Sequence, residues 1–282
     1  MFVTKIAILS ITPMFIKQLE QRQRQANSLL CVGLDPQPKK IAALDVSLDD
    51  WLKAIVDATA EYACAFKPQI AHFSALAAEQ QLANIIGYIH QNHPDIPVIL
   101  DSKRGDIGST AERYAEEAFV RYQADALTTN PYLGGDTLTA YTDYSDKGVV
   151  VLCKTSNPQS GQLQDLTLQS GQPLFLRVAQ LAAEQWNNNN NLMLVVGATY
   201  PEQLHAVREH VGDMPLLIPG IGAQGGDLTA TLKAGLRTDG LGLIISASRS
   251  IIYAGNGNDF AQQAGLAAEQ LKSAINQIRE HM

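Results

Sequence analysis

The chain has 282 residues, of which 46% are hydrophobic and 17% charged, a balance that predicts a globular protein with a sizeable core and excludes extensive disorder. Its formal net charge of -7 and its isoelectric point near 5.3 argue against a surface built to hold nucleic acid or an anionic membrane. The three cysteines, Cys31, Cys64 and Cys153, stand singly within apolar runs, which is typical of reduced core thiols and predicts a cytoplasmic protein.

The first residues, 1–16, contain an apolar stretch with a lone lysine, as the start of a signal peptide does. The stretch has no convincing small-residue cleavage site, and it is too short to span a bilayer. We therefore expect residues 1–25 to form an N-terminal extension and a leading helix. No other segment is a candidate membrane span.

Apolar runs of strand length alternate with helix-compatible segments such as 50–63, 110–122 and 201–212. Runs rich in Val, Ile and Leu are typical of parallel strands that are covered on both faces. Eight strand-then-helix units in about 250 residues predict an α/β fold, a (β/α)8 or TIM barrel, as one catalytic domain over residues 26–282. The expected strands are 29–35, 63–69, 98–103, 126–131, 149–156, 192–199, 215–221 and 241–248.

Polar residues follow most of these strands at the point where each strand ends. In (β/α)8 barrels the reactive groups come from the carboxyl ends of the strands and from the loops just after them. The pattern therefore predicts a site at this end, although any single member could instead cap a helix or pair at the rim. In chain order these residues are Asp35, Lys67, Asp101, Lys103, Asn130, Lys154, Ser156 and Arg249.

Asp101 and Lys103 stand two residues apart at the end of the third expected strand, so regular alternation would place both on one face. If that face is the barrel interior, Lys67 of the neighbouring strand is within reach. A lysine among carboxylates stays protonated, because negative charge favours its cationic form. The cluster therefore predicts a proton donor, with a structural salt-bridge network as the alternative. Gly105 frees the backbone just before Asp106, so this second acid need not follow the direction of the strand.

The loops after the seventh and eighth expected strands carry the features of an anion site. Segment 219–227 is rich in glycine, which exposes backbone N–H groups, and Arg249 stands at the opening of a helix. Barrels commonly hold a phosphate in these two loops, and an arginine adds a two-pronged contact to the phosphate oxygens. We therefore predict phosphate binding at this position.

Several catalytic motifs are absent from the sequence. It contains no HExxH, no CxxC, no GxSxG and no GxxxxGK[ST], and its six histidines are dispersed. These absences disfavour a metal site, a serine hydrolase and a nucleotide hydrolase. The remaining prediction is a lysine chemistry anchored by phosphate that uses neither a metal nor a cofactor.

The segment DSKRGDIGST (101–110) resembles the Asp-x-Lys-x-x-Asp-Ile-x-x-Thr signature of the orotidine 5'-phosphate decarboxylase family. The similarity covers about residues 28 to 280, and its motifs fall in order at the ends of successive expected strands. It is closest to the longer bacterial branch of that family. The further motifs are GLDP (33–36), FKPQ (66–69), NPYLG (130–134), CKTSNP (153–158), VVGATYP (195–201), IPGIGAQGGD (218–227) and SRSIIYA (248–254).

The resemblance implies a decarboxylase that converts orotidine 5'-phosphate (OMP) into UMP. By position, Lys103 would be the proton donor, flanked by Asp101 and Asp106, and Lys67 would complete a chain of alternating charge. The family likeness also implies a homodimer with shared active sites, in which Asp106 enters the site of the partner.

The resemblance implies substrate contacts as well. Asp35 and Lys67 would hold the ribose hydroxyls, with Ile107 and Thr110 reaching across the dimer interface. Ser156 would meet the amide edge of the pyrimidine ring, with Thr155 as the neighbouring candidate. Gln224 and Arg249 would hold the 5'-phosphate.

Three other functions are weighed against this one. A Schiff-base aldolase also uses a strand-end lysine and a phosphate site, but the carboxylates around Lys103 oppose the loss of its proton. A related barrel acting on a sugar phosphate would be expected to bind a divalent metal. A non-catalytic nucleotide-binding protein would be expected to have lost one of Asp101, Lys103 or Asp106, and all three are present.

Overall fold

Eight parallel strands form one sheet in the computed structural model, which describes residues 14–221 and 226–282. The order β2-β1-β8-β7-β6-β5-β4-β3 is that of a barrel opened between β2 and β3, and bridges from Phe66 to Val98 and from Gln69 to Asp101 close this gap. The predicted (β/α)8 barrel is therefore confirmed. The strands are β1 Leu30–Leu34, β2 Ala65–Pro68, β3 Ile99–Arg104, β4 Ala126–Thr129, β5 Gly148–Lys154, β6 Leu192–Val196, β7 Leu216–Pro219 and β8 Leu243–Ala247.

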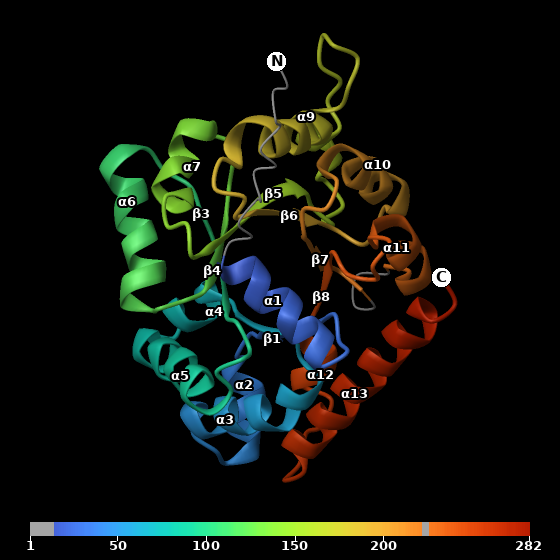
Figure 1. The fold of residues 1–282 in the computed structure, drawn as a ribbon. Helices are drawn as coiled ribbons and strands as arrows, with labels where there is room; N and C mark the ends of the chain where they lie inside the picture. The colour runs from blue at the N-terminus through green and yellow to red at the C-terminus, as the bar shows by residue number, and fades with distance from the viewer. Residues whose placement is uncertain (1–13, 222–225) are drawn as a thin grey trace, which may run out of the picture.

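Helices follow every strand and surround the barrel (Figure 1). Several end in a tighter or wider turn, and the expected helix 110–122 is an α-helix that continues into a π-helical turn. The α-helices are α1 Met14–Gln25, α2 Pro38–Ile41, α3 Leu48–Thr59, α4 Ile70–Ser74, α5 Glu79–Asn92, α6 Gly108–Glu116, α7 Gly135–Thr142, α8 Gly161–Gln164, α9 Leu174–Leu181, α10 Pro201–Val211, α11 Leu228–Gly235, α12 Arg249–Ile252 and α13 Phe260–Arg279. The short turns are η1 Ala42–Leu44, η2 Ala60–Tyr62, η3 Glu117–Arg121 and η4 Ala182–Trp186.

Helix α1 closes the amino end of the barrel, across which it lies in Figure 1. Its buried side chains Phe15, Ile16 and Leu19 pack against the apolar side chains inside the barrel. The Gln23 side chain is 2% exposed and donates a hydrogen bond of 2.8 Å to the Leu243 carbonyl at the start of β8. The leading helix expected before residue 25 thus forms the floor of the barrel.

Side chains inside the barrel change from apolar to polar along the strands. The inward side chains near the amino ends of the strands form an apolar layer. Because alternate residues of a strand face the same side, strand residues two positions after a member of this layer also point inward. Those positions hold buried polar side chains at the carboxyl end of the barrel: Lys67, Asp101, Thr128 and Ser246. The apolar layer beneath them comprises Cys31, Cys64, Ala65, Ile99, Ala126, Val150, Met193, Val195, Leu217 and Ile244.

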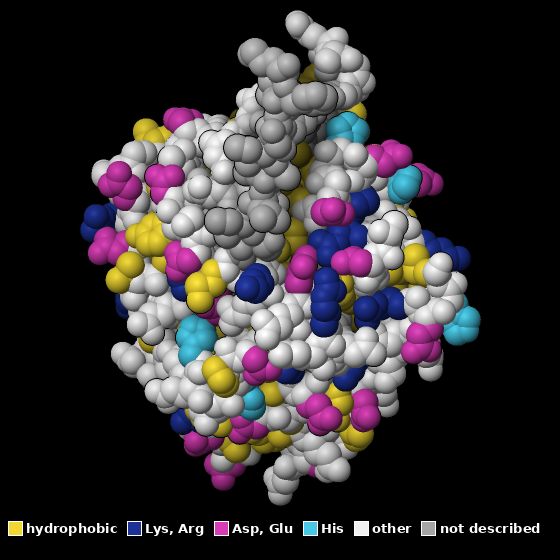
Figure 2. Space-filling view, in the orientation of Figure 1, with side chains coloured by type: hydrophobic (Ala, Val, Ile, Leu, Met, Phe, Trp, Pro, Cys, Tyr) yellow, Lys and Arg dark blue, Asp and Glu magenta, His cyan; other side chains and the backbone are white. Residues whose placement is uncertain are grey.

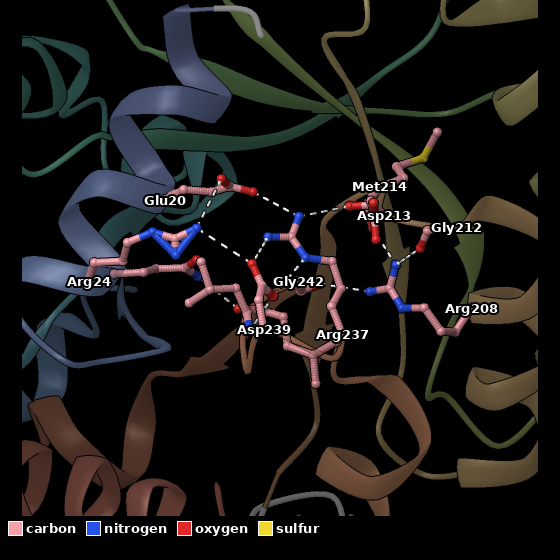
Figure 3. Close-up of polar contacts among 12 residues, drawn as sticks. Glu20, Arg24, Arg208, Gly212, Asp213, Met214, Arg237, Asp239 and Gly242 are labelled. Carbon is pink, nitrogen blue, oxygen red and sulfur yellow. Dashed lines mark hydrogen bonds and ion pairs between the residues drawn. The ribbon is translucent and has the colours of Figure 1, made fainter.

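A network of charged side chains surrounds the floor beside α1. Figure 2, which views this face, shows basic and acidic side chains interspersed in its middle. Figure 3 shows Arg237 between Glu20 and Asp239, with ion-pair distances of 2.8 Å to each. Arg208 donates to four backbone carbonyls, including those of Gly212 and Gly242, and therefore ties the loops that enter β7 and β8 together.

Burial lowers the pKa of Arg208 to about 10, with a further contribution from the positive charge of Arg237. The carbonyl oxygens around Arg208 compensate the burial of its guanidinium, because a buried charge is tolerated where it is fully hydrogen-bonded. The network therefore stiffens the end of the barrel opposite to the site. Within the described residues, none of the helices has the length and apolar character needed to cross a bilayer.

The role of α1 as the barrel floor predicts a large effect of Phe15→Ala. Phe15 is 1% exposed, and truncating a buried phenylalanine costs about 3–5 kcal/mol of unfolding free energy. We expect a clear fall in the urea midpoint, measured by circular dichroism. Met14→Ala, on the same helix at a residue that is 69% exposed, is the control and should leave the midpoint nearly unchanged. Equal midpoints for the two variants would show that α1 does not contribute to the core.

Candidate active site

Asp101 lies between two lysines at the carboxyl end of the barrel. Its Oδ2 atom is 2.8 Å from Nζ of Lys67, and its Oδ1 atom is 2.5 Å from Nζ of Lys103. The hydroxyl of Thr128, on β4, donates a third hydrogen bond of 2.9 Å to Oδ1. The side chains of Lys67 and Asp101 are 8% and 10% exposed, whereas that of Lys103 is 45% exposed. The cluster therefore presents one ammonium group to the open end of the barrel and buries the other.

The backbone at Lys103 differs from the regular strand that the sequence suggested. Lys103 has a φ of +48°, and the pairing of β3 with β4 shifts register between Leu100 and Arg104. The hydroxyl of Thr128 accepts hydrogen bonds from the N–H groups of Ser102 and Lys103, at 3.0 and 2.9 Å, and supports this bulge. The predicted contact between Asp101 and Lys103 is present. The regular alternation of side chains along β3 stops before Lys103, however, and the bulge directs the Lys103 side chain toward Asp101.

The charges of this cluster reinforce one another. Burial disfavours the ionised carboxylate of Asp101, but the ammonium groups of Lys67 and Lys103 outweigh that effect and lower the pKa of Asp101 below its usual range. Burial likewise disfavours the ammonium of Lys67, and the carboxylates of Asp101 and Asp35 outweigh it and raise the pKa of Lys67. Each group therefore keeps the other ionised at neutral pH.

A pocket of about 150 Å³ extends from this cluster to the loop after β8, and its lining includes Asp35, Lys67, Gly220, Ser248 and Arg249. It therefore brings together residues from the ends of β1, β2 and β8, where the sequence predicted polar residues, and from the glycine-rich loop after β7. The Oδ1 atom of Asp35 and the hydroxyl of Ser248 are buried there, and neither has a hydrogen-bond partner among the described residues. Buried polar atoms of this kind are candidates to bind a ligand.

Tyr253 fixes the loop that carries Asp35. Its hydroxyl donates to the carbonyl of Asp35 at 3.0 Å and accepts the N–H of Gln37 at 2.6 Å. Its ring stacks on Trp51 with centroids 5.5 Å apart. Tyr253 directly follows helix α12, which begins at Arg249, so one short segment carries the arginine and holds the aspartate loop.

The predicted residues of the segment after β3 and Ser156 of the loop after β5 are not among the residues that line this pocket. Asp106, Ile107 and Thr110 belong to the segment after β3, where Ile107 is 63% exposed and Asp106 accepts the N–H of Ile107. Gly105, which the sequence suggested as a point of backbone freedom, does not have a positive φ. A Cβ at Gly105 would lie 3.2 Å from the carbonyl oxygen of Asn130, so close packing is the physical reason for a glycine there.

Ser156 and Gln224 were the remaining predicted contacts. Ser156 is half-buried in the loop after β5, and the neighbouring hydroxyl of Thr155 is hydrogen-bonded to the side chains of Asn157 and Gln164. Gln224 lies outside the described residues. Gly220 and Arg249 of the predicted anion site are described, and both lie in the lining of the pocket.

Thr128 and Tyr253, which support Asp101 and Asp35, were not among the residues predicted from the sequence. Thr128 occupies an inward position of β4 and was detectable by the same alternation that was applied to Asp101. Tyr253 could not be found in this way, because its contact spans more than 200 residues of chain. Among the residues that the structure describes, no three His, Cys, Asp or Glu side chains are grouped so as to hold a metal ion.

The fold and site define the class of this protein. It is a (β/α)8-barrel enzyme whose charged cluster and adjoining pocket lie at the carboxyl ends of the strands, where such barrels carry their active sites. A family model described as "Orotidine 5'-phosphate decarboxylase / HUMPS family" matches residues 28–264. The chain belongs to this family.

Similar proteins carry the same name. The orotidine 5'-phosphate decarboxylase of Cellvibrio japonicus is 54% identical over 94% of this chain and 99% of its own length, and that of Bordetella pertussis is 53% identical with the same coverage. The solved structure of Leishmania donovani OMP decarboxylase is 41% identical, with a TM-score of 0.83 over 94% of this chain and 98% of its own. The family resemblance inferred from the motifs is thereby confirmed.

The ion pairs of Asp101 predict a pH-dependent loss of stability in Asp101→Asn. Removing one partner of a buried pair costs about 3–5 kcal/mol, because it leaves an uncompensated charge, here that of Lys67. Since the pKa of Asp101 is lowered on folding, its contribution is present in full above an unfolded pKa of about 3.9 and is lost as the pH falls through the folded value.

The measurement is urea unfolding of wild type and Asp101→Asn between pH 3 and pH 8. We expect the difference in unfolding free energy to be large and constant above about pH 5 and to shrink below about pH 4. Asp146→Asn, which changes an exposed carboxylate, is the control and should follow the wild type throughout. A difference independent of pH down to pH 3 would contradict this account of Asp101.

Proposed function

We propose that this chain converts orotidine 5'-phosphate into UMP and carbon dioxide, the last step of UMP biosynthesis. The observation that carries the proposal is the Lys67–Asp101–Lys103 cluster next to a pocket that reaches Arg249. A nucleoside monophosphate needs a charged reaction centre at one end of its site and an anion site at the other. The relatives named orotidine 5'-phosphate decarboxylase support this substrate over a sugar phosphate or an aldol substrate.

The substrate contacts follow from the pocket. Arg249 binds the 5'-phosphate with two parallel N–H donors, and Gln224 is the second proposed phosphate contact. Asp35 and Lys67 bind the ribose hydroxyls, for which the unpartnered Oδ1 atom of Asp35 is a ready acceptor. Ser156 meets the amide edge of the pyrimidine ring in this proposal, with Thr155 as the neighbouring candidate.

The chemistry requires stabilisation of a localised charge. When the bond from ring carbon 6 to the carboxylate breaks, carbon dioxide leaves and the electron pair stays in an sp2 orbital of that carbon. The ammonium of Lys103 stabilises this negative charge and then donates its proton to carbon 6. Asp101 repels the departing carboxylate and, with Lys67, keeps Lys103 fixed in place. No step calls for a metal or an organic cofactor.

Two copies of the chain complete each site in this proposal. Asp106, with Ile107 and Thr110, enters the active site of a partner subunit in a two-fold homodimer. The exposure of Ile107 supports this proposal, because an aliphatic side chain of that size is better accommodated at an interface than in water. Asp106 would then add a second carboxylate beside Lys103.

We further infer that residues 26–282 form the catalytic domain and that residues 1–25 are an extension with a leading helix. The three cysteines are free and buried, as in proteins of a reducing compartment, and we place the protein in the cytoplasm. UMP and OMP are its proposed small-molecule partners.

The direct test is the loss of OMP absorbance with purified protein in the presence of a chelator. Wild type should turn over OMP at an unchanged rate, and Lys103→Ala should abolish turnover while its circular dichroism stays native, because the ammonium acts mainly in the transition state. Borohydride should trap no substrate adduct. A trapped adduct on Lys103 would instead support an aldolase, and loss of activity with the chelator would support a metal-dependent barrel.

Arg249→Ala tests the phosphate site. A hydrogen bond to a charged group is worth about 1.5–3 kcal/mol, so the variant should bind UMP on the order of 10- to 150-fold more weakly. Uridine, which has no phosphate, should bind wild type and variant alike in isothermal titration calorimetry. Equal weakening of both ligands would show that Arg249 does not bind the phosphate.

Mixed dimers test the sharing of sites. Lys103→Ala and Asp106→Ala chains are each expected to be inactive, but a hybrid would contain one doubly damaged site and one intact site. Random exchange makes about half of the dimers hybrid, so activity should recover to roughly a quarter of the wild-type value. If both residues served the same subunit's site, mixing would restore nothing, even with exchange confirmed by mass-tagged subunits.

A further inference from the structure

Lys154, the last residue of β5, is a buried lysine that the proposed mechanism does not use. It is 1% exposed and ranks among the largest fully buried side chains of the described residues. Its ammonium lies 2.7 Å from Oδ1 of Asp165 and 3.3 Å from the hydroxyl of Ser160. The rings of Phe175 and Tyr200 have their centroids 5.8 and 5.6 Å from it.

Burial of the Lys154 ammonium is energetically unfavourable, so its presence needs an explanation. Desolvation of a lysine in a protein interior costs several kcal/mol, and replacing a buried ion pair by apolar side chains is often neutral or stabilising. The preceding residues of β5 are apolar and rich in valine, so a lysine is an exception in this strand. The charge at Lys154 therefore contributes something besides packing, and its partners show what that is.

Both partners of Lys154 belong to the segment 155–173 that connects β5 to α9. Asp165 directly follows helix α8, and Ser160 directly precedes it. The ion pair therefore ties the far side of this segment back to the strand from which it leaves. Because the Asp165 side chain is 41% exposed, the contact reaches from the barrel interior to the surface of the loop.

A second pair of contacts lies beside the first. The N–H of Thr155 donates to Oε1 of Gln164 at 2.9 Å, and the amide of Gln164 donates to the Thr155 hydroxyl at 2.9 Å. Two consecutive residues of the strand end thus hold two consecutive residues at the end of α8. This double attachment, Lys154 to Asp165 and Thr155 to Gln164, closes the segment 155–165 into a fixed loop.

Ser156 is the next residue of that loop and is wedged against β6. A Cβ at Gly197, just after β6, would lie 2.8 Å from both Cβ and N of Ser156, so the two backbones are in contact. The N–H of Gly197 donates to the carbonyl of Lys154 at 2.8 Å. The position of Ser156 is therefore set by Lys154 and Thr155 from within the loop and by Gly197 from the side.

We propose that Lys154, through its ion pair with Asp165, is a positioning residue that holds Ser156 against the pyrimidine ring and so sets the affinity of the site for the base. The inference rests on the proposed function, because it takes Ser156 as the base contact. Lys154 itself touches the loop and does not touch the substrate.

The experiment compares UMP with ribose 5-phosphate, which has a hydroxyl at carbon 1 of the sugar in place of the base. UMP carries phosphate, ribose and pyrimidine, whereas ribose 5-phosphate lacks the pyrimidine. For Lys154→Met we expect about tenfold weaker UMP binding in calorimetry, the value of one well-placed hydrogen bond, and ribose 5-phosphate binding within twofold of wild type. Lys154→Arg, which keeps the charge, should restore at least half of the lost affinity, expressed as the logarithm of the dissociation constant.

Two further variants separate positioning from general stability. Lys147→Met removes a lysine that directly precedes the opposite end of β5 and pairs with Asp125 at 3.7 Å, and it should leave the ratio of UMP to ribose 5-phosphate affinity unchanged. Asp165→Asn removes the charge from the more exposed partner. Asp165→Asn should lower the ratio of UMP to ribose 5-phosphate affinity at least threefold. If Lys154→Met does not fold, the result for Asp165→Asn tests the proposal in its place.

The outcomes are distinct. A ratio that falls in Lys154→Met or Asp165→Asn and stays constant in Lys147→Met supports the proposal. A parallel loss of both ligands, or no loss of either, in a folded Lys154 or Asp165 variant would overturn it. Failure of the wild type to bind UMP more tightly than ribose 5-phosphate would instead refute the proposed function.

Discussion

The site depends on the ion pairs that the buried carboxylate of Asp101 makes with Lys67 and Lys103. A carboxylate that is 10% exposed stays ionised only where opposite charges lie in fixed contact with it, and Lys67 and Lys103 supply them at 2.8 and 2.5 Å. Each lysine is in turn held by the carboxylate, and loss of Asp101 would leave the buried ammonium of Lys67 without a compensating charge. The geometry of the cluster is therefore set before any ligand arrives, as electrostatic catalysis requires.

The barrel supports this cluster by separating apolar from polar layers. At the amino end, α1 and the first inward layer form a dry core, and the charges around Arg208 and Arg237 lie outside it. Two residues further along, the inward positions of the same strands are Lys67, Asp101 and Thr128. Rigid strands set into a packed core hold these polar side chains more firmly than loops could.

The parts of this arrangement that follow from local pattern were predictable. Eight apolar runs predicted the barrel, and the rule that reactive groups follow strands predicted Asp35, Lys67, Asp101 and Arg249 as members of one site. The conformation of Lys103 was not predictable, because it depends on a hydrogen bond from its own N–H to the hydroxyl of Thr128 on the next strand. The same holds for α1 as the barrel floor and for Lys154 with Asp165, since side-chain partners across a fold leave no periodic signal in the sequence.

The short segment after β8 explains how two distant parts of a ligand can be recognised together. Arg249 opens this segment and Tyr253 ends it, and the Tyr253 hydroxyl binds the backbone on both sides of Pro36 in the loop that presents Asp35. The arginine and the aspartate are thus joined through four residues of helix and one pair of hydrogen bonds. Any displacement of Arg249 would therefore be transmitted to the Asp35 loop. In the proposed function, binding energy gained from the phosphate at Arg249 can in this way fix the groups next to Lys67 and Asp101.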